Sequence, residues 1–531
     1  MRVLGLSNIF RTGPLCSATI RCFIALTLSL VVMSSRAATH YVDLNSAQPI
    51  SPYTDWSTAA TNIQDAVDVA TNGDVVLVND GIYFEGRRPN LTGSYPLYVS
   101  NETNRLVITN RITVQSVNGP TLTHINGGGN VRCVYLAGQA VLSGFTLTNG
   151  AVGYTNYPNP LLADIIWSNG GGICGGDLFP GTVSNCVITA NNANGYGGGA
   201  YGVNLLKCQL TQNSAGSGGG VARSSVSGCT IVSNCAASFS YPPRPLRFPS
   251  FGLGGGVYSC RVTNCVIAKN SAYQGGGMAA SGTAINCTVV NNLATLDGGI
   301  TSQDLSVACG LTNCIVCFNS AATNNNYSTG DSFSFDHCCV FPLPGGLGNF
   351  KNDPGFENLA DGHYHLSSNS PAINAGNNLT AVGNFDVDGN PRIIGGTVDV
   401  GAYEFQTPAS ALPYLWARQY GLATDGSADS EDSDGDGMSN WQEFIAGTNP
   451  TNASSVLAMT SVMPVNSLSW TVVKWRSVAG KTYVLQRSTS LAGNPPFSLI
   501  QSNIPGSSGT TLFIDETTTN GAAYFYRVGV Q

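Results

Sequence analysis

The chain has 531 residues, which exceeds one ordinary compact domain unless that domain grows along one axis by repetition. Only 10% of its residues are charged and 64 are glycine, whereas globular domains are about 25% charged and about 7% glycine. The formal net charge of -7 disfavours binding to the phosphates of nucleic acid, so we expect no nucleic-acid partner.

The N-terminus has the pattern of a secretory signal peptide. Arginines precede a short apolar run at residues 23–33, and the small residues Ser35 and Ala37 follow it. A membrane anchor is the alternative, but it needs about 20 apolar residues, roughly twice the length of this run. We therefore predict a signal peptide at residues 1–37, a secreted or cell-surface protein, and no transmembrane segment after cleavage.

Residues 62–86 predict a short amphipathic helix followed by strand-forming residues. Apolar residues at helical spacing form one face of this helix, which comprises Ile63, Ala66, Val67 and Ala70. Such a face suits a helix that covers one open end of a larger apolar core.

From residue 182 the chain repeats a phrase of roughly 22 residues, and this repeat is the strongest pattern in the sequence. Each copy has a cysteine, an aliphatic residue two positions later and an asparagine five positions later. The cysteines are Cys186, Cys208, Cys229, Cys265, Cys287 and Cys314. The asparagines are Asn191, Asn213, Asn234, Asn270, Asn292 and Asn319.

The register of the repeat predicts a stack of short parallel strands. Alternation sends the cysteine and the aliphatic residue to the same face of a strand, and one coil is too small to bury that face alone. Stacking would place like residues about 4.8 Å apart, so that the asparagines form an amide ladder at a corner. Asparagine also tolerates the left-handed conformation that such corners need. Glycine triplets mark a second bend, at residues 197–199, 218–220, 254–256 and 275–277.

The cysteines of the repeat are interpreted as small buried apolar residues. Fourteen of the 16 cysteines lie beyond the predicted signal peptide, in a chain that we expect in an oxidising compartment. A redox or metal role is the alternative, but no CxxC pair and no histidine recurs with the repeat. Disulfide formation by other cysteines, such as Cys338 and Cys339, stays open.

The phrases TVSNCVITANNANGYGGG and AINCTVVNNLATLDGG resemble the repeats of polymorphic outer membrane proteins and related pectin-lyase-like bacterial β-helices. Residues 62–86 resemble the N-terminal segment of that fold. Residues 364–376 and 385–405 resemble the choice-of-anchor Q segment, which closes such solenoids in exported bacterial proteins. The resemblance implies an all-β chain with a right-handed parallel β-helix at residues 38–406, closed by residues 350–406, and says little about activity.

Residues 407–452 contain a linker, a short helix and the phrase DSDGDGMSNWQE, which matches the twelve-residue EF-hand loop. The predicted Ca²⁺ ligands, with a backbone carbonyl from the methionine and two oxygens from the glutamate, are Asp432, Asp434, Asp436, Met438, Asn440 and Glu443. An acidic solvated linker is the alternative. The segment resembles thrombospondin type 3-like and dockerin-like calcium segments, although those usually carry several loops. We predict that Ca²⁺ orders a joint between the solenoid and the last domain.

Residues 453–531 predict a small C-terminal β-sandwich, because strand-like runs alternate with turns. The pattern W…GKTY…YFYRV resembles a fibronectin type III-like module, and that resemblance implies adhesion or spacing. The aromatic residues alternate along the strands, so we interpret them as core and not as a platform for sugars: Trp470, Trp475, Tyr483 and Tyr526.

The distribution of acidic residues argues mildly against an enzyme. Glycan lyases and hydrolases of the β-helix class use clustered carboxylates, yet no Asp or Glu occurs between Leu178 and Leu296. Catalysis would then fall to the ends of the solenoid, where the candidates are Asp336, His337 and Asp399. Turn chemistry and ion pairs explain the acids of residues 385–405 more simply, so we assign no catalytic residue.

Two insertions interrupt the repeat between its asparagine and its glycine triplet, at residues 151–169 and 235–253. They leave the same corner of the coil, three coils apart, and carry aromatic and basic side chains. Our hypothesis is that they wall a groove for an extended ligand such as a glycan, with the ligand-binding residues Tyr154, Tyr157, Trp167, Phe239, Tyr241, Arg244, Arg247 and Phe248. The alternative is that these aromatic residues seal the loops onto the solenoid.

Three functions stay open on this basis. The first is a non-catalytic secreted or cell-surface protein that binds an extracellular polysaccharide or another cell-surface component through its solenoid. The second is a polysaccharide lyase or glycoside hydrolase of the pectin-lyase-like class, with its site at an end of the solenoid. The third is a structural spacer on the surface.

Overall fold

The computed structural model describes residues 37–89, 103–153, 168–176, 179–237, 252–279, 282–302, 309–329, 333–465, 470–491, 497–518 and 523–531. Residues 1–36 lie outside this part of the chain, so the predicted signal peptide stays a prediction. Within the described residues, no helix is both long enough and apolar enough to cross a membrane.

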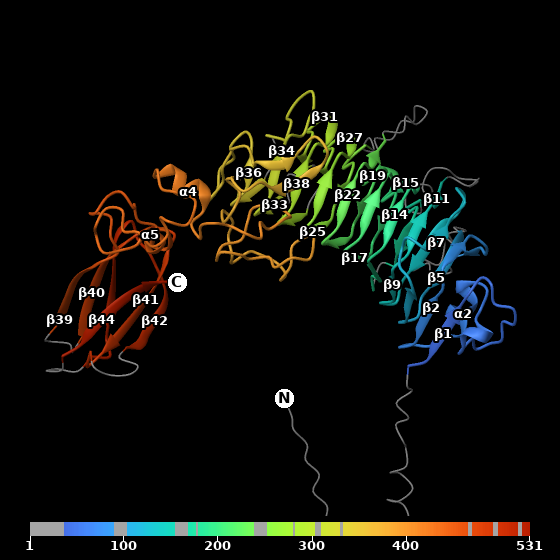
Figure 1. Ribbon diagram of the computed structural model, residues 1–531, viewed down its shortest axis with the longest axis horizontal. Helices are drawn as coiled ribbons and strands as arrows, with labels where there is room; N and C mark the ends of the chain where they lie inside the picture. Colours follow the sequence, from blue (N-terminus) through green and yellow to red (C-terminus); the bar gives the residue numbers. More distant parts are fainter. Residues whose placement is uncertain are drawn as a thin grey trace, which may run out of the picture.

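The chain forms a right-handed parallel β-helix whose coils stack along the long axis of the molecule (Figure 1). The short strands align in four sheets, here named A to D. Among the described residues, every pairing in these sheets is parallel except that of β4 with β5. The predicted fold class is therefore confirmed.

Sheets A and B contain the strands on either side of the corner that precedes each repeat cysteine. Sheet A comprises β1 (Thr39–Val42), β2 (Val75–Val78), β6 (Thr113–Ser116), β9 (Val141–Ser143), β13 (Thr182–Ser184), β17 (Asn204–Leu206), β21 (Ser225–Ser227), β25 (Arg261–Thr263), β29 (Thr283–Ile285), β33 (Cys309–Thr312) and β35 (Phe333–Asp336). Sheet B comprises β3 (Gly81–Tyr83), β7 (Thr123–Asn126), β10 (Thr146–Thr148), β14 (Val187–Thr189), β18 (Gln209–Thr211), β22 (Thr230–Val232), β26 (Val266–Ala268), β30 (Thr288–Val290), β34 (Ile315–Cys317) and β36 (Cys339–Val340).

Sheets C and D contain the strands on either side of the glycine triplets. Sheet C comprises β4 (Arg88–Pro89), β5 (Thr103–Ile108), β8 (Arg132–Leu136), β12 (Ile173–Gly175), β16 (Ala200–Tyr201), β20 (Val221–Ala222), β24 (Val257–Tyr258), β28 (Met278–Ala279) and β32 (Ile300–Thr301). Sheet D comprises β11 (Ala151–Val152), β15 (Asn192–Tyr196), β19 (Ser214–Ser217), β23 (Cys235–Ala236), β27 (Ser271–Gln274) and β31 (Leu293–Leu296).

The repeat asparagines form the predicted amide ladder at the corner between sheets B and D. The Nδ2 group of Asn213 donates to Oδ1 of Asn234 at 3.0 Å, and the backbone amide of Asn213 donates to the same oxygen at 3.0 Å. Asn234 repeats both bonds toward Asn270, and the series runs on through the coils. Each ladder amide therefore satisfies backbone groups that a buried corner would otherwise leave without partners.

The left-handed residues at the corners differ in part from the expectation. The ladder asparagines do not adopt positive φ; the residue before each of them does, as at Gln212 with φ 56° and Ser233 with φ 58°. Asparagine fills the left-handed position at the other corner, before the cysteine, as at Asn185 and Asn264. The ladder position instead selects asparagine for its side-chain amide, which both donates and accepts.

The glycine triplets turn the chain from sheet D into sheet C as predicted. Gly197 has φ 66°, a conformation that costs glycine nothing. A Cβ on Gly198 would lie 2.2 Å from the carbonyl oxygen of Ser214 in the next coil. Adjacent coils thus approach too closely at this bend for any side chain.

The repeat cysteines line the interior of the solenoid, where they contact the inward aliphatic residues of sheets A and B. All 14 cysteines of the described residues are thiols, and 12 of them are buried. Burial raises the pKa of Cys133, Cys186 and Cys260 to about 12. The repeat cysteines are therefore buried core residues, in agreement with the apolar interpretation, and Cys338 and Cys339 form no disulfide.

Ellman's reagent should modify at most two thiols of the native protein, because only Cys174 and Cys235 are half-buried. After denaturation in guanidinium chloride all 14 cysteines of a chain that begins at residue 38 should react. Rapid reaction of many native thiols would contradict the sealed interior. Fewer than 14 reactive thiols after denaturation would reveal disulfides.

A short helix covers the N-terminal end of the solenoid. The helix α2 (Ile63–Val69) buries Ile63, Ala66 and Val67 against the interior, and the side chain of Asn62 caps its first turn. The 3₁₀ helix η1 (Trp56–Thr58) precedes it. The predicted apolar helix face is confirmed.

The segment that follows the last coils folds back along the side of the solenoid. It contains the antiparallel pair β37 (Phe356–Asn358) and β38 (His363–Leu366). Tyr364 packs on the outer residues Val266 and Val290 of sheet B. Residues 350–406 thus cover the outer face of sheet B, a role that the expected closing of the end did not include.

Two short helices and a small β-sandwich complete the chain (Figure 1). The helices are α4 (Tyr414–Gln419) and α5 (Asn440–Ala446). The sandwich has two antiparallel three-stranded sheets, β39 (Met459–Val465), β40 (Trp470–Ser477) and β43 (Gly509–Asp515) against β42 (Ser498–Pro505), β41 (Thr482–Ser488) and β44 (Phe525–Val530). Trp475 and Tyr483 lie in its core as predicted, and Tyr526 packs against them.

Candidate functional site

The acidic loop at residues 432–443 lies between α4 and α5, and its last four residues form the first turn of α5. Ser439 caps α5 and exchanges hydrogen bonds with Gln442, which fixes the direction of the helix. Gly437 has φ 96° with open space around it, so the sharp turn needs glycine for its backbone alone. Serine and glutamine at this spacing start a helix at the end of the loop.

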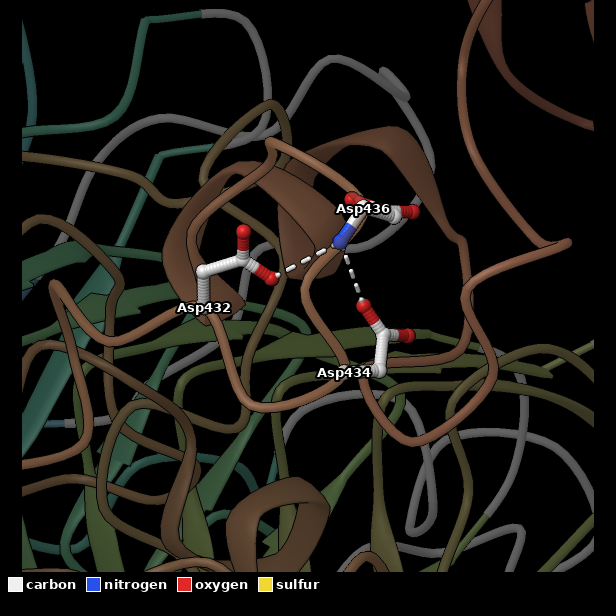
Figure 2. Close-up of side chains that lie close together, drawn as sticks. All are labelled: Asp432, Asp434 and Asp436. Atoms are coloured by element: carbon white, nitrogen blue, oxygen red, sulfur yellow. Dashed lines mark hydrogen bonds between the residues drawn. The ribbon is translucent and has the colours of Figure 1, made fainter.

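Three aspartates of the loop converge. One carboxylate oxygen from each of Asp432, Asp434 and Asp436 lies within 4.8 Å of the others. Asp432 accepts the backbone amides of Gly435 at 2.8 Å and Gly437 at 2.9 Å. Figure 2 shows the carboxylates of Asp432 and Asp434 directed at the backbone nitrogen of Asp436. These bonds curl the loop around the cluster.

Buried oxygens without hydrogen-bond donors face this loop from α5 and from the aspartates. Glu443 is fully buried, and neither of its carboxylate oxygens has a partner. Oδ2 of Asp434 and Oδ2 of Asp436 are also buried without partners. A buried polar atom with no partner costs about 1–3 kcal/mol, and a charged one costs more. The chain does not accumulate such atoms in one loop without a compensating ligand.

Asn440 is buried at the start of α5. Its Nδ2 group donates to the carbonyl oxygen of Ala428 at 2.8 Å and to Oγ of Ser433 at 2.9 Å, which leaves Oδ1 as the buried atom without a donor. The amide of Met438 donates to Asp436 at 2.8 Å. Four of the six predicted ligand residues, Asp434, Asp436, Asn440 and Glu443, have a buried oxygen without a partner. Both oxygens of Asp432 accept backbone amides, and the carbonyl of Met438 stays a prediction.

The electrostatics of the loop suit a divalent cation. Burial and the charges of Asp434 and Asp436 raise the pKa of Glu443 to about 7. A hard cation with six to eight oxygen ligands would reverse that repulsion and satisfy the unpartnered oxygens together. The residues present therefore fit Ca²⁺.

The acidic loop is fastened to the solenoid side of the molecule. Asp429 accepts hydrogen bonds from Oγ of Ser410 and from the backbone amide of Ala411. In α5, Phe444 packs against Trp416 of α4 with ring centroids 5.5 Å apart. Tyr414 of α4 lies in the core that residues 350–406 form on sheet B. Order in the loop is thus connected to the packing of the closing segment.

Asp399, one of the three catalytic candidates, is buried in the closing segment. Its carboxylate accepts the backbone amides of Asn374 at 2.6 Å and Phe405 at 2.7 Å. Nearby, Arg392 and Glu404 form a buried ion pair at 3.1 Å. Burial and the charge of Glu404 raise the pKa of Asp399 well above its usual range. Both oxygens of Asp399 accept backbone amides of neighbouring turns, so this carboxylate stabilises the fold of the closing segment.

The free energy of unfolding should fall as the pH rises from about 5 to 8, since two buried carboxyl groups share one guanidinium. Burial raises the pKa of Glu404 to about 7, against the attraction of Arg392. A raised folded-state pKa means that the folded protein binds the proton more tightly, so stability is present at low pH and lost as the pH passes about 7. Urea unfolding at several pH values measures this slope. Glu404→Gln should flatten it, and an unchanged slope would contradict the assignment.

Asp336 and His337 lie at the end of sheet A. Nδ1 of His337 and Oδ1 of Asp336 are 3.0 Å apart, and Oδ2 of Asp336 accepts a hydrogen bond from Asn377 at 3.2 Å. His337 occupies the left-handed corner position before Cys338, with φ 50°. The pair is partly exposed, and its geometry follows from the corner that it forms.

The residues of the hypothesised ligand groove lie outside the described part of the chain. These are Tyr154, Tyr157, Trp167, Phe239, Tyr241, Arg244, Arg247 and Phe248. The strands with which the two insertions begin, β11 and β23, are three pairings apart in sheet D. The two insertions therefore leave one side of the solenoid at the spacing expected from the repeat.

The sequence pattern did not predict a column of tyrosines on the outer face of sheet C, in which Tyr135 is buried and Tyr201 and Tyr258 are half-buried. Tyr135, Tyr201 and Tyr258 occupy equivalent positions on alternate strands of the sheet. The sequence indicates this column at the second residue after each glycine triplet. In successive coils that residue is Tyr201, Ala222, Tyr258 and Ala279.

The fold defines the chain as a right-handed parallel β-helix protein. No protein-family model and no curated protein matches it. Among solved structures, a pectate lyase, Pel9A, is similar, with 15% identity and a TM-score of 0.40 over 70% of this chain and 97% of the other. A rhamnogalacturonan lyase is similar with 13% identity and a TM-score of 0.35, over 61% of this chain and 92% of the other. The Dettilon tailspike protein has 13% identity and a TM-score of 0.28, over 58% and 64%. The fold assignment rests on the chain's own sheet topology.

Proposed function

We propose that this protein is an exported, non-catalytic β-helix protein that binds a polysaccharide or another cell-surface component along its solenoid. The observation that carries the proposal is the absence of Asp and Glu between Leu178 and Leu296. That stretch supplies strands β13 to β31, the most regular coils of the solenoid. These coils carry no carboxylates of their own, so they offer stacking and hydrogen bonding to a glycan and lack the paired acids of glycoside hydrolysis; the acids of residues 350–406 lie over sheet B.

Ca²⁺ is the proposed cofactor of the acidic loop, held by Asp432, Asp434, Asp436, Asn440 and Glu443 with the carbonyl of Met438. The buried oxygens without partners support this proposal. The positive charge of the ion would balance the negative charges of the four neighbouring carboxylates. Its role is to order the joint between the closing segment and the sandwich. For the sandwich, the fibronectin type III-like resemblance favours a role in adhesion or spacing.

Affinity electrophoresis tests the binding function. The chain from residue 38 onward is run through gels that contain one polysaccharide each, neutral or acidic, with Ca²⁺ present. Retardation by at least one polysaccharide is the expected result. Unretarded migration in every gel would contradict the binding function.

Polysaccharide cleavage is the second candidate function, because Asp336 and His337 form a hydrogen-bonded acid–base pair at the surface. New reducing ends or unsaturated products would support it. Loss of those products in Asp336→Asn would assign the site.

A further inference from the structure

The outward residues of sheet C form a regular column of alternating large and small side chains. Pairing places Tyr135, Cys174, Tyr201, Ala222, Tyr258 and Ala279 above one another. Their strand neighbours, such as Ala200 and Val257, point into the core. Tyrosine therefore recurs on every second strand, at about 10 Å along the axis.

Two further side chains complete this face around Tyr201 and Tyr258. The ring of Tyr196 stacks on that of Tyr258, with centroids 5.4 Å apart and an angle of 28° between planes. Arg223, at the corner after β20, places its guanidinium carbon 5.6 Å from the centroid of Tyr196. Its Nη1 group donates to the hydroxyl of Tyr201 at 3.3 Å. We name Tyr196, Tyr201, Arg223 and Tyr258 the tyrosine–arginine surface.

A cleft adjoins the tyrosine–arginine surface. Its free volume is about 320 Å³, and its lining includes Tyr201, Arg223, Pro180, Asn204 and Ser225. The cleft thus combines an aromatic ring, a cation and polar groups, which is the composition that orients a polar ligand.

The charge of this part of the solenoid is positive, in contrast to the rest of the chain. Residues 178–296 contain six basic and no acidic residues, a formal charge of +6 in a chain of -7: Lys207, Arg223, Arg244, Arg247, Arg261 and Lys269. Arg223 is exposed and, among the described residues, makes no ion pair with a carboxylate. Its positive charge is therefore available to an anionic ligand.

We propose that the tyrosine–arginine surface and its cleft bind an acidic polysaccharide, one whose sugar rings carry carboxylates. The C–H face of a sugar packs on the tyrosine rings, and the guanidinium of Arg223 binds the carboxylate. Tyr201 and Tyr258, two strands apart in sheet C, suit a ligand that extends as a chain along the axis. This inference rests on the proposed polysaccharide-binding function and adds the chemical class and the binding residues.

Affinity electrophoresis with polygalacturonate and with its fully methyl-esterified form tests the inference, because esterification removes the charge and keeps the sugar chain. Arg223→Gln and Tyr201→Ala should each weaken binding to polygalacturonate by about tenfold or more. Tyr201→Phe, which keeps the ring and removes the hydroxyl bond to Arg223, should weaken it less. The esterified polymer should bind weakly to all forms.

Two variants serve as matched controls. Arg261→Gln removes an exposed charge from the same stretch on sheet A, and Tyr273→Ala removes an exposed ring from sheet D. Both should leave binding unchanged. The thermal midpoint of each variant establishes that it is folded.

The outcomes separate this inference from the proposed function. Equal binding to both polymers, or binding unaffected by Arg223→Gln and Tyr201→Ala, would overturn the inference and leave polysaccharide binding in place. Equal binding of polyphosphate would also overturn it, since charge alone would then suffice. Failure to bind any polysaccharide would overturn both.

Discussion

Replacing Glu443 with glutamine should weaken Ca²⁺ binding by about 100-fold or more, since it removes a charged ligand that offers two oxygens. Glu443 is fully buried on α5, and both of its oxygens lack hydrogen-bond partners. In the absence of Ca²⁺ the same substitution should stabilise the protein. Three aspartates and burial disfavour the charged form of Glu443, so the neutral amide should raise the thermal midpoint of the apo protein.

Isothermal titration calorimetry measures the affinity for Ca²⁺. Thermal unfolding measures the effect of the substitution on the thermal midpoint, once with Ca²⁺ and once with a chelator. Ca²⁺ at 100 times its dissociation constant should stabilise the native protein by about 2.7 kcal/mol. Glu431→Gln is the matched control, because that exposed carboxylate lies outside the loop pattern. Equal Ca²⁺ affinity of Glu443→Gln and the native protein would show that the loop is only an acidic turn.

Asn234→Ala should lower the free energy of unfolding by about 3–5 kcal/mol, because one side chain serves several buried partners. Oδ1 of Asn234 accepts two bonds from Asn213, and its Nδ2 group donates to the carbonyl oxygen of Leu210 and to Asn270. Alanine removes the acceptor of the Asn213 backbone amide and of one Asn213 side-chain N–H group, while Nδ2 of Asn213 keeps its bond to the carbonyl of Ile188. It also removes one donor from the carbonyl of Leu210. It also interrupts the ladder in the middle of the solenoid.

Urea unfolding measures the loss, and Asn192→Ala provides the control. Asn192 is exposed one residue beyond the ladder, and its side chain bonds only Oγ of Ser214 among the described contacts. Its replacement should cost about 0.5 kcal/mol or less. Equal losses for the two variants would mean that the ladder adds no stability beyond an ordinary surface asparagine.

The solenoid could be predicted from the sequence because the spacing of the repeat residues determines how successive coils align. A cysteine and an aliphatic residue two positions later must share one face, and the asparagine five positions after the cysteine must then recur at one corner. The structure has Cys229, Ile231 and Asn234 buried in those roles. The acidic loop could also be found from the sequence, because its spacing pattern lies within twelve consecutive residues; that it binds Ca²⁺ stays a prediction.

Other features depend on contacts that no local pattern records. The left-handed residue before each ladder asparagine varies in type, as Gln212 and Ser233 show, because the backbone alone sets that conformation. The packing of Tyr364 on sheet B joins segments about 75 to 100 residues apart in the chain. The tyrosine–arginine surface arises only when coils stack, since Tyr196 and Tyr258 come from coils that are not adjacent in sequence.

The chain-length distribution of a bound polysaccharide, recovered from its complex with the native protein in Ca²⁺, tests binding without cleavage most directly. Size-exclusion chromatography compares the polymer before and after incubation. We predict an unchanged distribution for a polysaccharide that retards the protein in affinity gels. Progressively shorter chains that carry new reducing or unsaturated ends would contradict a non-catalytic function and establish the protein as an enzyme.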